Sequence, residues 1–398
     1  MITAIVASDN HLGAYYSRMG AQRLEERRRR LQQAFERVVS EAIERRADLF
    51  LHAGDLYDRV DPRNADRRFV ARQIRRLNDA GIPVVAVAGN HDSPRAPGYD
   101  GRVTPHEEID ALGAAILFRE TDTLSEVRMQ IRGASVRLRG MSSDFNRPPD
   151  SCPLEGLDPG SRAADVEIVL LHYGIRGISA FEGEPSLSLE NLDRLGADAL
   201  CVGHLHRRTQ RRLPSGGLLL NPGATEHVHF GEEGFDTGCW HLRLEPGRAQ
   251  AQYVHIPCQA MRTLDLDAGA LAGECDDLTA IICREIEAVS APDQLLRVRL
   301  SGAMERSRLQ ELDLSAIQAR GNALNFFCQV ESSDLAAVDR LGGLMIQAGF
   351  SFDPRAVIQD VARAAAQEYE EDDEQREIIR AAEQEVLAAY DRMAGGSR

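Results

Sequence analysis

Five short, mostly apolar runs in this 398-residue chain each lead directly into a polar motif, and this pairing constrains the fold more than any other feature. The runs have the length and composition of strands in a sheet that is covered on both faces. They span residues 2–7, 48–53, 82–88, 166–171 and 198–202. Amphipathic helical patterns at residues 24–42 and 64–79 separate the first three runs. The alternation of strand and helix predicts an α/β domain.

The polar motifs carry groups that bind metal ions. They are Asp9-Asn-His11, Gly54-Asp55-Leu-Tyr-Asp58, Gly89-Asn90-His91-Asp92, His172, and Gly203-His204-Leu-His206. Ligands of open α/β sheets bind beyond the carboxyl ends of the strands, so we expect the five motifs to converge on one crevice. Carboxylate and imidazole groups suit Mn, Fe or Zn. One carboxylate can also bridge two ions about 3.5–4 Å apart, which predicts a two-metal site for phosphodiester hydrolysis.

Local backbone geometry enters this prediction in two ways. Side chains two positions apart, as in Asp-x-His and His-x-His, point the same way where the backbone is extended. Glycine before Asp55, Asn90 and His204 allows the chain to turn sharply off each strand.

Each motif also has a simpler interpretation. A single histidine at a strand end is commonly structural, Gly-Asp-x-x-Asp can be a turn with a helix cap, and Asn-His-Asp can be a turn. If the simpler interpretation held for every motif, metal-binding residue types would have to occur at five strand ends by chance. A metal centre is therefore the favoured interpretation.

The order of these motifs resembles that of the calcineurin-like metallophosphoesterases, and more closely that of the SbcD-type double-strand-break repair nucleases. The resemblance is carried by SDNHLG, AFERVVSEAIERRADLFLHAGDLYDRVDPRNADRRF, LNDAGIPVVAVAGNHDSP, GHLHRRTQ and NPGATEHVHFGEEGFDTGCW. It extends over about residues 1–257. It implies a four-layer α/β/β/α sandwich with a smaller α+β capping domain and C-terminal helices. The corresponding domains are residues 1–257 (nuclease), 258–352 (capping) and 353–398 (helical partner-binding segment).

The resemblance also implies a division of roles within the site. One ion is held by Asp9, His11, Asp55 and His206, and the other by Asp55, Asn90, His172 and His204. His91 acts as a general acid or charge stabiliser and is oriented by Asp92. Asp58 either supports a metal ligand or caps a helix. The expected cofactor is a pair of divalent ions, and Mn²⁺ is the metal expected for such a nuclease, although the ligands also suit Fe or Zn.

Charge is unevenly distributed along the chain. The net charge is −15, but residues 1–257 carry 33 Arg against 36 acidic residues, and residues 258–398 carry 14 Arg against 26. The basic residues are all arginine, which suits bidentate phosphate contacts. Candidates for DNA contact are Arg18, Arg23, Arg59, Arg63, Arg207 and Arg208. The run at residues 27–30 either contacts phosphates or forms a solvated helix face.

Beyond residue 257 a second series of strand-like and helical patterns begins. Strand-like runs at 263–266, 295–300 and 325–330 alternate with helical patterns at 277–289 and 307–318, and the chain from Asp353 onward is expected to be helical around the acidic run 368–374. The last helix carries an apolar stripe from Ile378 to Met393. By resemblance it docks on the coiled-coil root of an SbcC-type ATPase, and the alternative is that it packs on its own domain. A homodimer is also expected.

The compartment is expected to be cytoplasmic, without membrane contact. No apolar run reaches the roughly 18 residues of a membrane span, and the first strand starts almost at the initiator Met, leaving no room for a signal peptide. Seven irregularly spaced cysteines fit reduced thiols.

Three functions remain to be compared. The first is a two-metal DNA nuclease, acting as an exonuclease or endonuclease in double-strand-break repair with an ATPase. The second is a metallophosphoesterase for a small phosphodiester or phosphomonoester, and the third is a non-catalytic scaffold subunit. The complete ligand set disfavours the third, and the extra residues beyond the catalytic domain disfavour the second.

Overall fold

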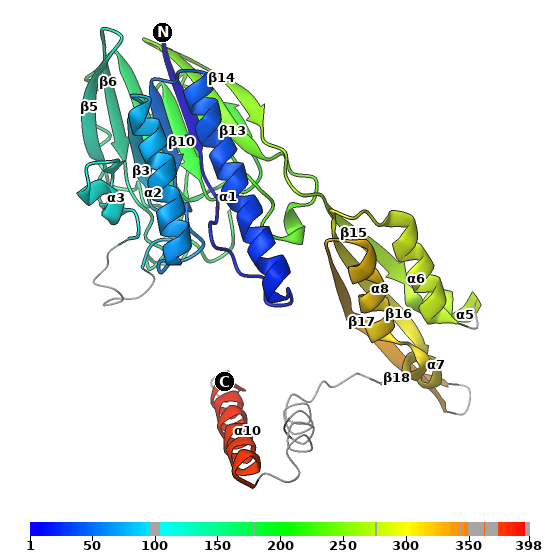
Figure 1. Ribbon diagram of the computed structural model, residues 1–398. Helices are drawn as coiled ribbons and strands as arrows, with labels where there is room; N and C mark the ends of the chain where they lie inside the picture. The colour runs from blue at the N-terminus through cyan, green and yellow to red at the C-terminus, as the bar shows by residue number, and fades with distance from the viewer. Residues whose placement is uncertain are drawn as a thin grey trace. The chain divides into compact units, whose positions relative to one another are not determined.

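The computed structural model describes residues 1–94, 104–178, 180–274, 277–341, 344–348, 362 and 373–394. The chain divides into two compact units (Figure 1). The first comprises Met1–Leu266, Thr279–Leu300 and Asp313–Glu331, and the second comprises Asp267–Leu278, Ser301–Leu312 and Ser332–Arg398. The expected domain boundaries near residues 257 and 352 remain predictions.

Two six-stranded sheets form the body of the first unit. The first sheet has the order β14 (Arg248–His255), β13 (Gly238–Glu245), β1 (Ile2–Ala7), β2 (Leu49–Ala53), β3 (Val84–Val87) and β4 (Ile116–Leu117). The second has the order β11 (Thr209–Arg212), β12 (Leu218–Asn221), β10 (Ala199–Gly203), β7 (Val166–His172), β6 (Ala134–Gly140) and β5 (Ser125–Ile131). The neighbours β1–β2–β3 and β6–β7–β10–β12 run parallel.

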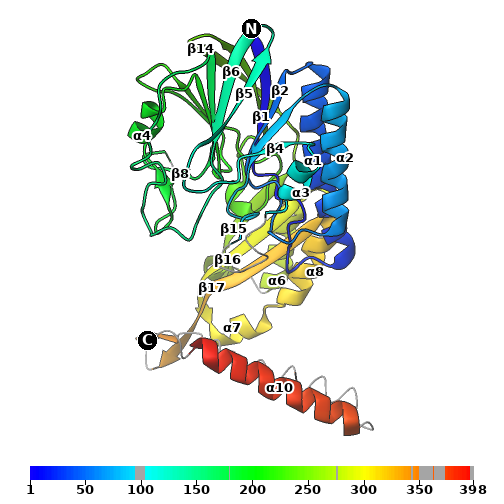
Figure 2. The same ribbon diagram turned by 90° about the vertical axis from the view of Figure 1, so that its left-hand side faces the viewer.

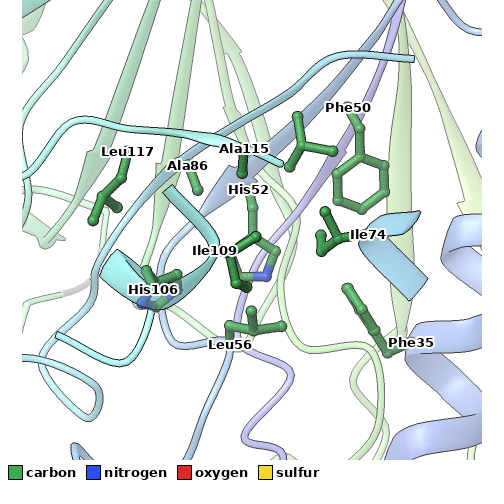
Figure 3. Close-up of a pocket in the computed structure, with 11 residues that line it drawn as sticks. Phe35, Phe50, His52, Leu56, Ile74, Ala86, His106, Ile109, Ala115 and Leu117 are labelled. Carbon is green, nitrogen blue, oxygen red and sulfur yellow. The ribbon is translucent and has the colours of Figure 1, made fainter. Parts of the chain in front are cut away.

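Helices α1 (Ala21–Glu44) and α2 (Asn64–Asp79) cover the outer face of the first sheet (Figure 2). Phe35 of α1 and Ile74 of α2 pack with Phe50 of β2 in one apolar cluster. This cluster contains a small cavity into which the rings of His52 and His106 also point (Figure 3). The amphipathic pattern expected at 64–79 matches α2 in both bounds, and α1 is slightly longer than its pattern.

The core between the two sheets explains why the strands are apolar on both sides. Leu51 and Val87 of the first sheet pack here with Ile168 and Cys201 of the second. On the outer face of the second sheet, Val169 and its neighbours pack on α4 (Leu189–Arg194) and on loop residues between 141 and 157. The α/β/β/α layering is confirmed, with a last layer that consists mostly of loop among the described residues.

A four-stranded sheet follows, in the order β15 (Met261–Asp267), β16 (Leu295–Glu305), β17 (Phe327–Leu341) and β18 (Leu344–Ala348). Its accompanying helices are α5 (Ala268–Glu274), α6 (Leu278–Val289), α7 (Arg306–Glu311) and α8 (Leu314–Leu324). The single helix expected at 307–318 is wrong, because Asp313 starts a new helix by accepting a hydrogen bond from the backbone N–H of Ala316.

The last described element is α10 (Asp373–Ala394), within which side chains are described for residues 377–387. Most of the acidic run at 368–374 and the side chains of Tyr390 and Met393 lie outside the described residues. Across the described parts of the chain, no helix has the length and apolar character needed to cross a membrane. The six cysteines that the structure describes are free thiols.

Candidate metal centre

The five motifs meet where the carboxyl ends of strands from both sheets come together. The backbone N–H of His204, after β10, donates to both carboxylate oxygens of Asp9, after β1, at 3.1 and 3.2 Å. The Nδ1 atom of His172, at the end of β7, donates to the carbonyl of Ala53, at the end of β2, at 2.7 Å. The backbone N–H of His91, which follows β3, donates to Asp55 Oδ1 at 2.9 Å. The predicted convergence therefore joins two sheets at one edge.

Four of the candidate ligands have a left-handed backbone. The φ angles are 53° at Asp9, 46° at His11, 54° at Asp55 and 93° at His204. The condition under which the side chains of Asp-x-His and His-x-His would point the same way, an extended backbone, is therefore not met here. Such left-handed conformations cost about 1–3 kcal/mol each in non-glycine residues and concentrate at functional sites, where surrounding contacts maintain them.

Glycine is required beside these ligands mainly for space. Gly54 has a φ of +92°, and a side chain there would collide with the ring of His172. A side chain at Gly89 would collide with the Asp55 carboxylate. The backbone at Gly89, where a turn was expected, thus also lies very close to the Asp55 carboxylate. This lack of a side chain lets the loop after β3 reach Asp55.

Two groups of ligand atoms share Asp55. In the first, His11 Nε2 lies 3.0 Å from His206 Nε2 and 3.8 Å from Asp55 Oδ2, and His206 Nε2 lies 3.9 Å from Asp9 Oδ1. In the second, Asn90 Oδ1 lies 3.1 Å from His172 Nε2 and 3.0 Å from His204 Nδ1. Asp55 Oδ2 is 3.2 Å from His172 Nε2 and so adjoins both groups.

The remaining nitrogen of each histidine ring faces an acceptor. His172 Nδ1 faces Ala53 O, His204 Nε2 faces Glu184 Oε2 at 3.2 Å, and His206 Nδ1 faces Glu232 Oε1 at 2.7 Å. His11 Nδ1 lies 3.4 Å from Asp58 Oδ1. These contacts favour tautomers whose inward nitrogens carry lone pairs, and those lone pairs face one another or the Asn90 oxygen. Inward nitrogens and an amide oxygen that face one another in this way can all bind a cation placed between them. Nitrogen and oxygen ligands of these kinds suit Mn, Fe or Zn.

The protonation of the site leads to the same conclusion. Burial lowers the pKa of His11, but the carboxylates of Asp58, Asp55 and Asp9 outweigh burial and raise it to about 9. Burial likewise opposes the effect of Asp55 on His172, whose pKa is also raised to about 9. Burial raises the pKa of Asp55, yet the neighbouring His172 and His11 hold it well below its usual value. The carboxylates thus stabilise positive charge here, which protons supply in the absence of metal ions.

His91 lies beside the ligands with its side chain about a third exposed. Its Nδ1 atom donates to the Asp58 carbonyl at 3.2 Å and lies 3.8 Å from Asp58 Oδ1. Asp92 was expected to orient His91. Instead, its oxygens accept from the backbone N–H groups of Gly89 and Tyr57 at 2.7 and 3.2 Å, so Asp92 shapes the loop and Asp58 positions His91.

Two functional carboxylates, Glu184 and Glu232, were missed in the sequence. Glu184 lies in the loop before β9 (Ser186–Leu187), and Glu232 ends the short 3₁₀ helix η2 (Phe230–Glu232). Neither follows a buried strand, so the signal that identified the ligands does not apply to them. Only the position of Glu232 within the stretch FGEEGF, which contributed to the family resemblance, drew attention to that segment.

An open cleft of about 940 Å³ is lined by Arg207, Arg208 and Phe181 together with five of the candidate ligands, which are His11, Asp55, Asn90, His204 and His206. Arg207 lies over the ring of Phe235, and Arg208 pairs with Asp236 at 2.7 Å. The other candidate DNA-binding arginines lie outside this cleft. Arg23 donates to the side chain and carbonyl of Asn322, Arg63 pairs with Asp66 and Glu25, Arg59 lines a separate hollow, and Arg18 lines another. Arg27 is fully buried, so a solvated face for the whole run at 27–30 is wrong.

Comparisons with known proteins agree with this geometry. The model of the calcineurin-like phosphoesterase family matches residues 2–208, just over half of the chain. Proteins named DNA double-strand break repair protein Mre11 are similar over longer stretches. The protein from Sulfolobus acidocaldarius is 23% identical over 303 residues (75% of this chain, 74% of that protein), and that from Saccharolobus solfataricus is 26% identical over 238 residues (59% and 58%).

A third such protein, from Aeropyrum pernix, is 42% identical over 286 residues, which cover 66% of this chain and 63% of that protein. The chain thus spans about three quarters of the first relative and less than two thirds of the other two. The chain belongs to the calcineurin-like phosphoesterase family, and Mre11 proteins are among its homologues.

Proposed function

We propose that this protein is a two-metal DNA phosphodiesterase of double-strand-break repair. The observation that carries the proposal is the position of Asp55, whose Oδ2 atom adjoins both groups of ligand atoms. Asp9, His11, Asp55 and His206 would hold one divalent ion, and Asp55, Asn90, His172 and His204 the other. Ions bound there would supply Lewis-acid activation of the phosphodiester and of water, and Mn²⁺ is the proposed metal.

The chain's own residues have distinct tasks in this mechanism. Asp58, Glu184 and Glu232 keep three of the ligand histidines in one tautomer and orientation. His91 is partly exposed in the cleft, where it can donate a proton or hydrogen bond to the departing oxygen. Arg207 and Arg208 line the same cleft and can hold flanking phosphates.

DNA is favoured as the substrate for two reasons. Homologues carry the name of a DNA double-strand break repair protein, and the cleft is open and lined by arginine beside the metal ligands. A metallophosphoesterase acting on a small phosphodiester would use the same ligands and is the competing function. Exonuclease and endonuclease cleavage are both compatible with an open cleft.

The test is cleavage by purified protein that has been stripped of metal and reloaded with Mn²⁺. Labelled single- and double-stranded DNA are compared with a small nitrophenyl phosphodiester, with and without a chelator. We expect metal-dependent cleavage of DNA that Asp55→Asn reduces to less than about a tenth, because the shared carboxylate is weakened. Asp79→Asn, a matched change on the exposed end of α2, should have no effect. Rapid hydrolysis of the small diester without cleavage of DNA would favour the competing function.

The proposal includes docking on an SbcC-type ATPase through α10 and association as a homodimer. Ile378 and Val386 of this helix are 54% and 51% exposed. Exposed apolar side chains at helical spacing suit docking in a groove or on a coiled coil.

A further inference from the structure

Phe181 is a large apolar side chain exposed beside the metal centre. It is 60% exposed and lines the same cleft as His204, His206 and Arg207. Its ring meets that of His204 edge to face, with centroids 5.7 Å apart and an interplanar angle of 87°. Exposing such a ring to water is unfavourable, so its place in a cleft that binds a ligand suggests a contact with that ligand.

Phe181 is the last ring in a column of aromatic side chains. The rings of Tyr173 and Phe145 are stacked, with centroids 5.5 Å apart and an interplanar angle of 14°. The centroid of Phe145 lies 5.3 Å from that of His204, and the His204 ring in turn contacts Phe181. Tyr173 is fully buried, and its hydroxyl accepts from the backbone N–H of Asp144 at 2.7 Å. The column thus runs from the core of the second sheet to the cleft, where Phe181 is its outermost ring.

The position of Phe181 is distinctive among the described residues. Among the described Phe, Tyr and Trp side chains, Tyr15 is the other one of comparable exposure, at 59%, and it does not line this cleft. Phe181 therefore combines an accessible aromatic surface with proximity to a predicted metal ligand and to the arginines of the cleft.

We propose that Phe181 forms a base subsite, in which its ring stacks on the nucleobase next to the scissile phosphate. This inference rests on the proposed function and adds a specificity determinant to it. A phosphodiester held at the ligand groups brings its attached nucleoside to the rim of the cleft. An aromatic ring without polar atoms stacks on any base, so the subsite distinguishes a base from no base and does not discriminate between sequences.

The experiment combines substitutions of Phe181 with removal of single bases from the DNA. An oligonucleotide with one mapped cleavage position is compared with versions that carry an abasic residue on either side of that position. The protein variants are Phe181→Trp, which keeps the aromatic ring, Phe181→Leu, which keeps an apolar side chain, and Leu112→Ala as the exposed control. Leu112 is 78% exposed and does not line the cleft.

In Phe181→Leu we expect KM for the intact DNA to rise about 5- to 50-fold, with a smaller change in kcat, because a stacking contact is lost. One of the two abasic positions should produce a similar rise in the wild type and little further rise in Phe181→Leu. Phe181→Trp should keep the wild-type KM for intact DNA and should show the same rise in KM when the base is removed. Leu112→Ala should behave like the wild type.

Two further measurements separate stacking from other roles. Metal content should be the same in all variants, and loss of metal from Phe181→Leu would overturn the proposal by assigning Phe181 to the support of His204. Binding of an oligonucleotide with 2-aminopurine at the sensitive position should quench its fluorescence in the wild type and not in Phe181→Leu.

If the abasic residue raised KM by the same factor in the wild type and in Phe181→Leu, the base subsite would also be overturned. DNA that binds with quenching but is not cleaved would contradict the proposed nuclease function and leave the subsite supported. A protein that binds no DNA would overturn both proposals.

Discussion

His11 Nε2 and His206 Nε2 lie 3.0 Å apart, although 195 positions separate these residues in the chain. Asp58 Oδ1 lies near the other nitrogen of His11, and Glu232 Oε1 binds the other nitrogen of His206. Two imidazole nitrogens this close share either a proton, in an N–H···N hydrogen bond, or a metal ion bound between them. The contact that links the segments after β1 and β10 at this point is therefore one between two polar side chains, and not apolar packing.

His91→Asn should separate catalysis from metal binding. His91 Nδ1 donates to the Asp58 carbonyl, and His91 has no part in the two ligand sets proposed here. We expect kcat for DNA cleavage to fall about 100-fold or more, the scale for losing an acid or a charge-stabilising group, while metal content stays unchanged. Elemental analysis and single-turnover cleavage measure the two effects. Loss of one ion from this variant would make His91 a ligand.

Glu232→Ala should weaken metal binding without removing a ligand. The Glu232 carboxylate is fully buried and accepts from His206 Nδ1 at 2.7 Å and from the backbone N–H of Val228 at 2.8 Å. Loss of a carboxylate that supports a metal-bound histidine typically reduces affinity about 10- to 100-fold. Calorimetric titration with Mn²⁺ should show this change, with Glu232→Gln in between because its amide oxygen still accepts. The adjacent exposed Glu233→Ala is the control, and equal affinity in both alanine variants would contradict the role given to Glu232.

The sequence predicted that the proposed ligands lie close together, but it did not identify the carboxylates that contact them. Asp9, Asp55, His172 and His204 lie at or just after the ends of buried strands, and the carboxyl ends of parallel strands lie at one edge of a sheet. Glu184 lies in a loop and Glu232 in a short 3₁₀ helix, and the course of both segments depends on tertiary packing, so no local pattern could assign them to His204 and His206. The left-handed backbone at the ligands was also unpredictable, because it is maintained by long-range hydrogen bonds such as that from Asp9 N to Gly54 O.

His52 should make folding sensitive to acid. Its Nε2 donates to Asn10 Oδ1 at 2.6 Å, and its ring lies in the apolar cavity with Phe35 and Ile74 (Figure 3). Burial, with help from the nearby His106 and His172, lowers its pKa to about 3. An unfolded histidine has a pKa of about 6.5, so between these values only the unfolded chain takes up the proton.

Stability from this group is therefore present above pH 6.5 and is lost as pH falls from 6.5 towards 3, by up to about 1.4 kcal/mol per pH unit. His52→Gln can still donate to Asn10 and does not titrate, so its unfolding free energy should fall less steeply over this range. Denaturant unfolding of the chelated proteins at several pH values measures the difference. Parallel pH profiles for the two proteins would rule out this contribution.

Arg27→Met should destabilise the fold by leaving a buried charge unpaired. The guanidinium of Arg27 is fully buried, lies 3.1 Å from Glu226 Oε1 and donates to Gln259 Oε1 at 3.1 Å. Removal of one partner from such a pair costs about 3–5 kcal/mol, because the other charge stays desolvated. Adding Glu226→Gln should restore part of the loss. Arg29→Met, on an exposed residue of the same helix, should cost under about 1 kcal/mol, and a similar Tm for both single variants would contradict the assignment.

Deletion of the residues after Tyr369 should separate partner docking from the chemistry. All the proposed metal ligands precede residue 207, and the two sheets that position them lie within Met1–Leu266. The truncated protein should therefore bind metal and cleave short DNA as the full chain does. It should lose association with an SbcC-type ATPase from the same organism, because the exposed Ile378 and Val386 are removed.

The same deletion tests the alternative that α10 packs on its own unit. In that case the truncation would remove apolar contacts and lower stability by several kcal/mol, which thermal melting would show as a large fall in Tm. A full-length Ile378→Ser/Val386→Ser variant keeps the helix and changes only its apolar side chains, with Arg380→Ser on an exposed position as the control. Docking through α10 predicts that the double variant folds normally and fails to co-purify with the ATPase. Retention of the ATPase by both the truncated and the double variant would place the docking surface elsewhere in the chain.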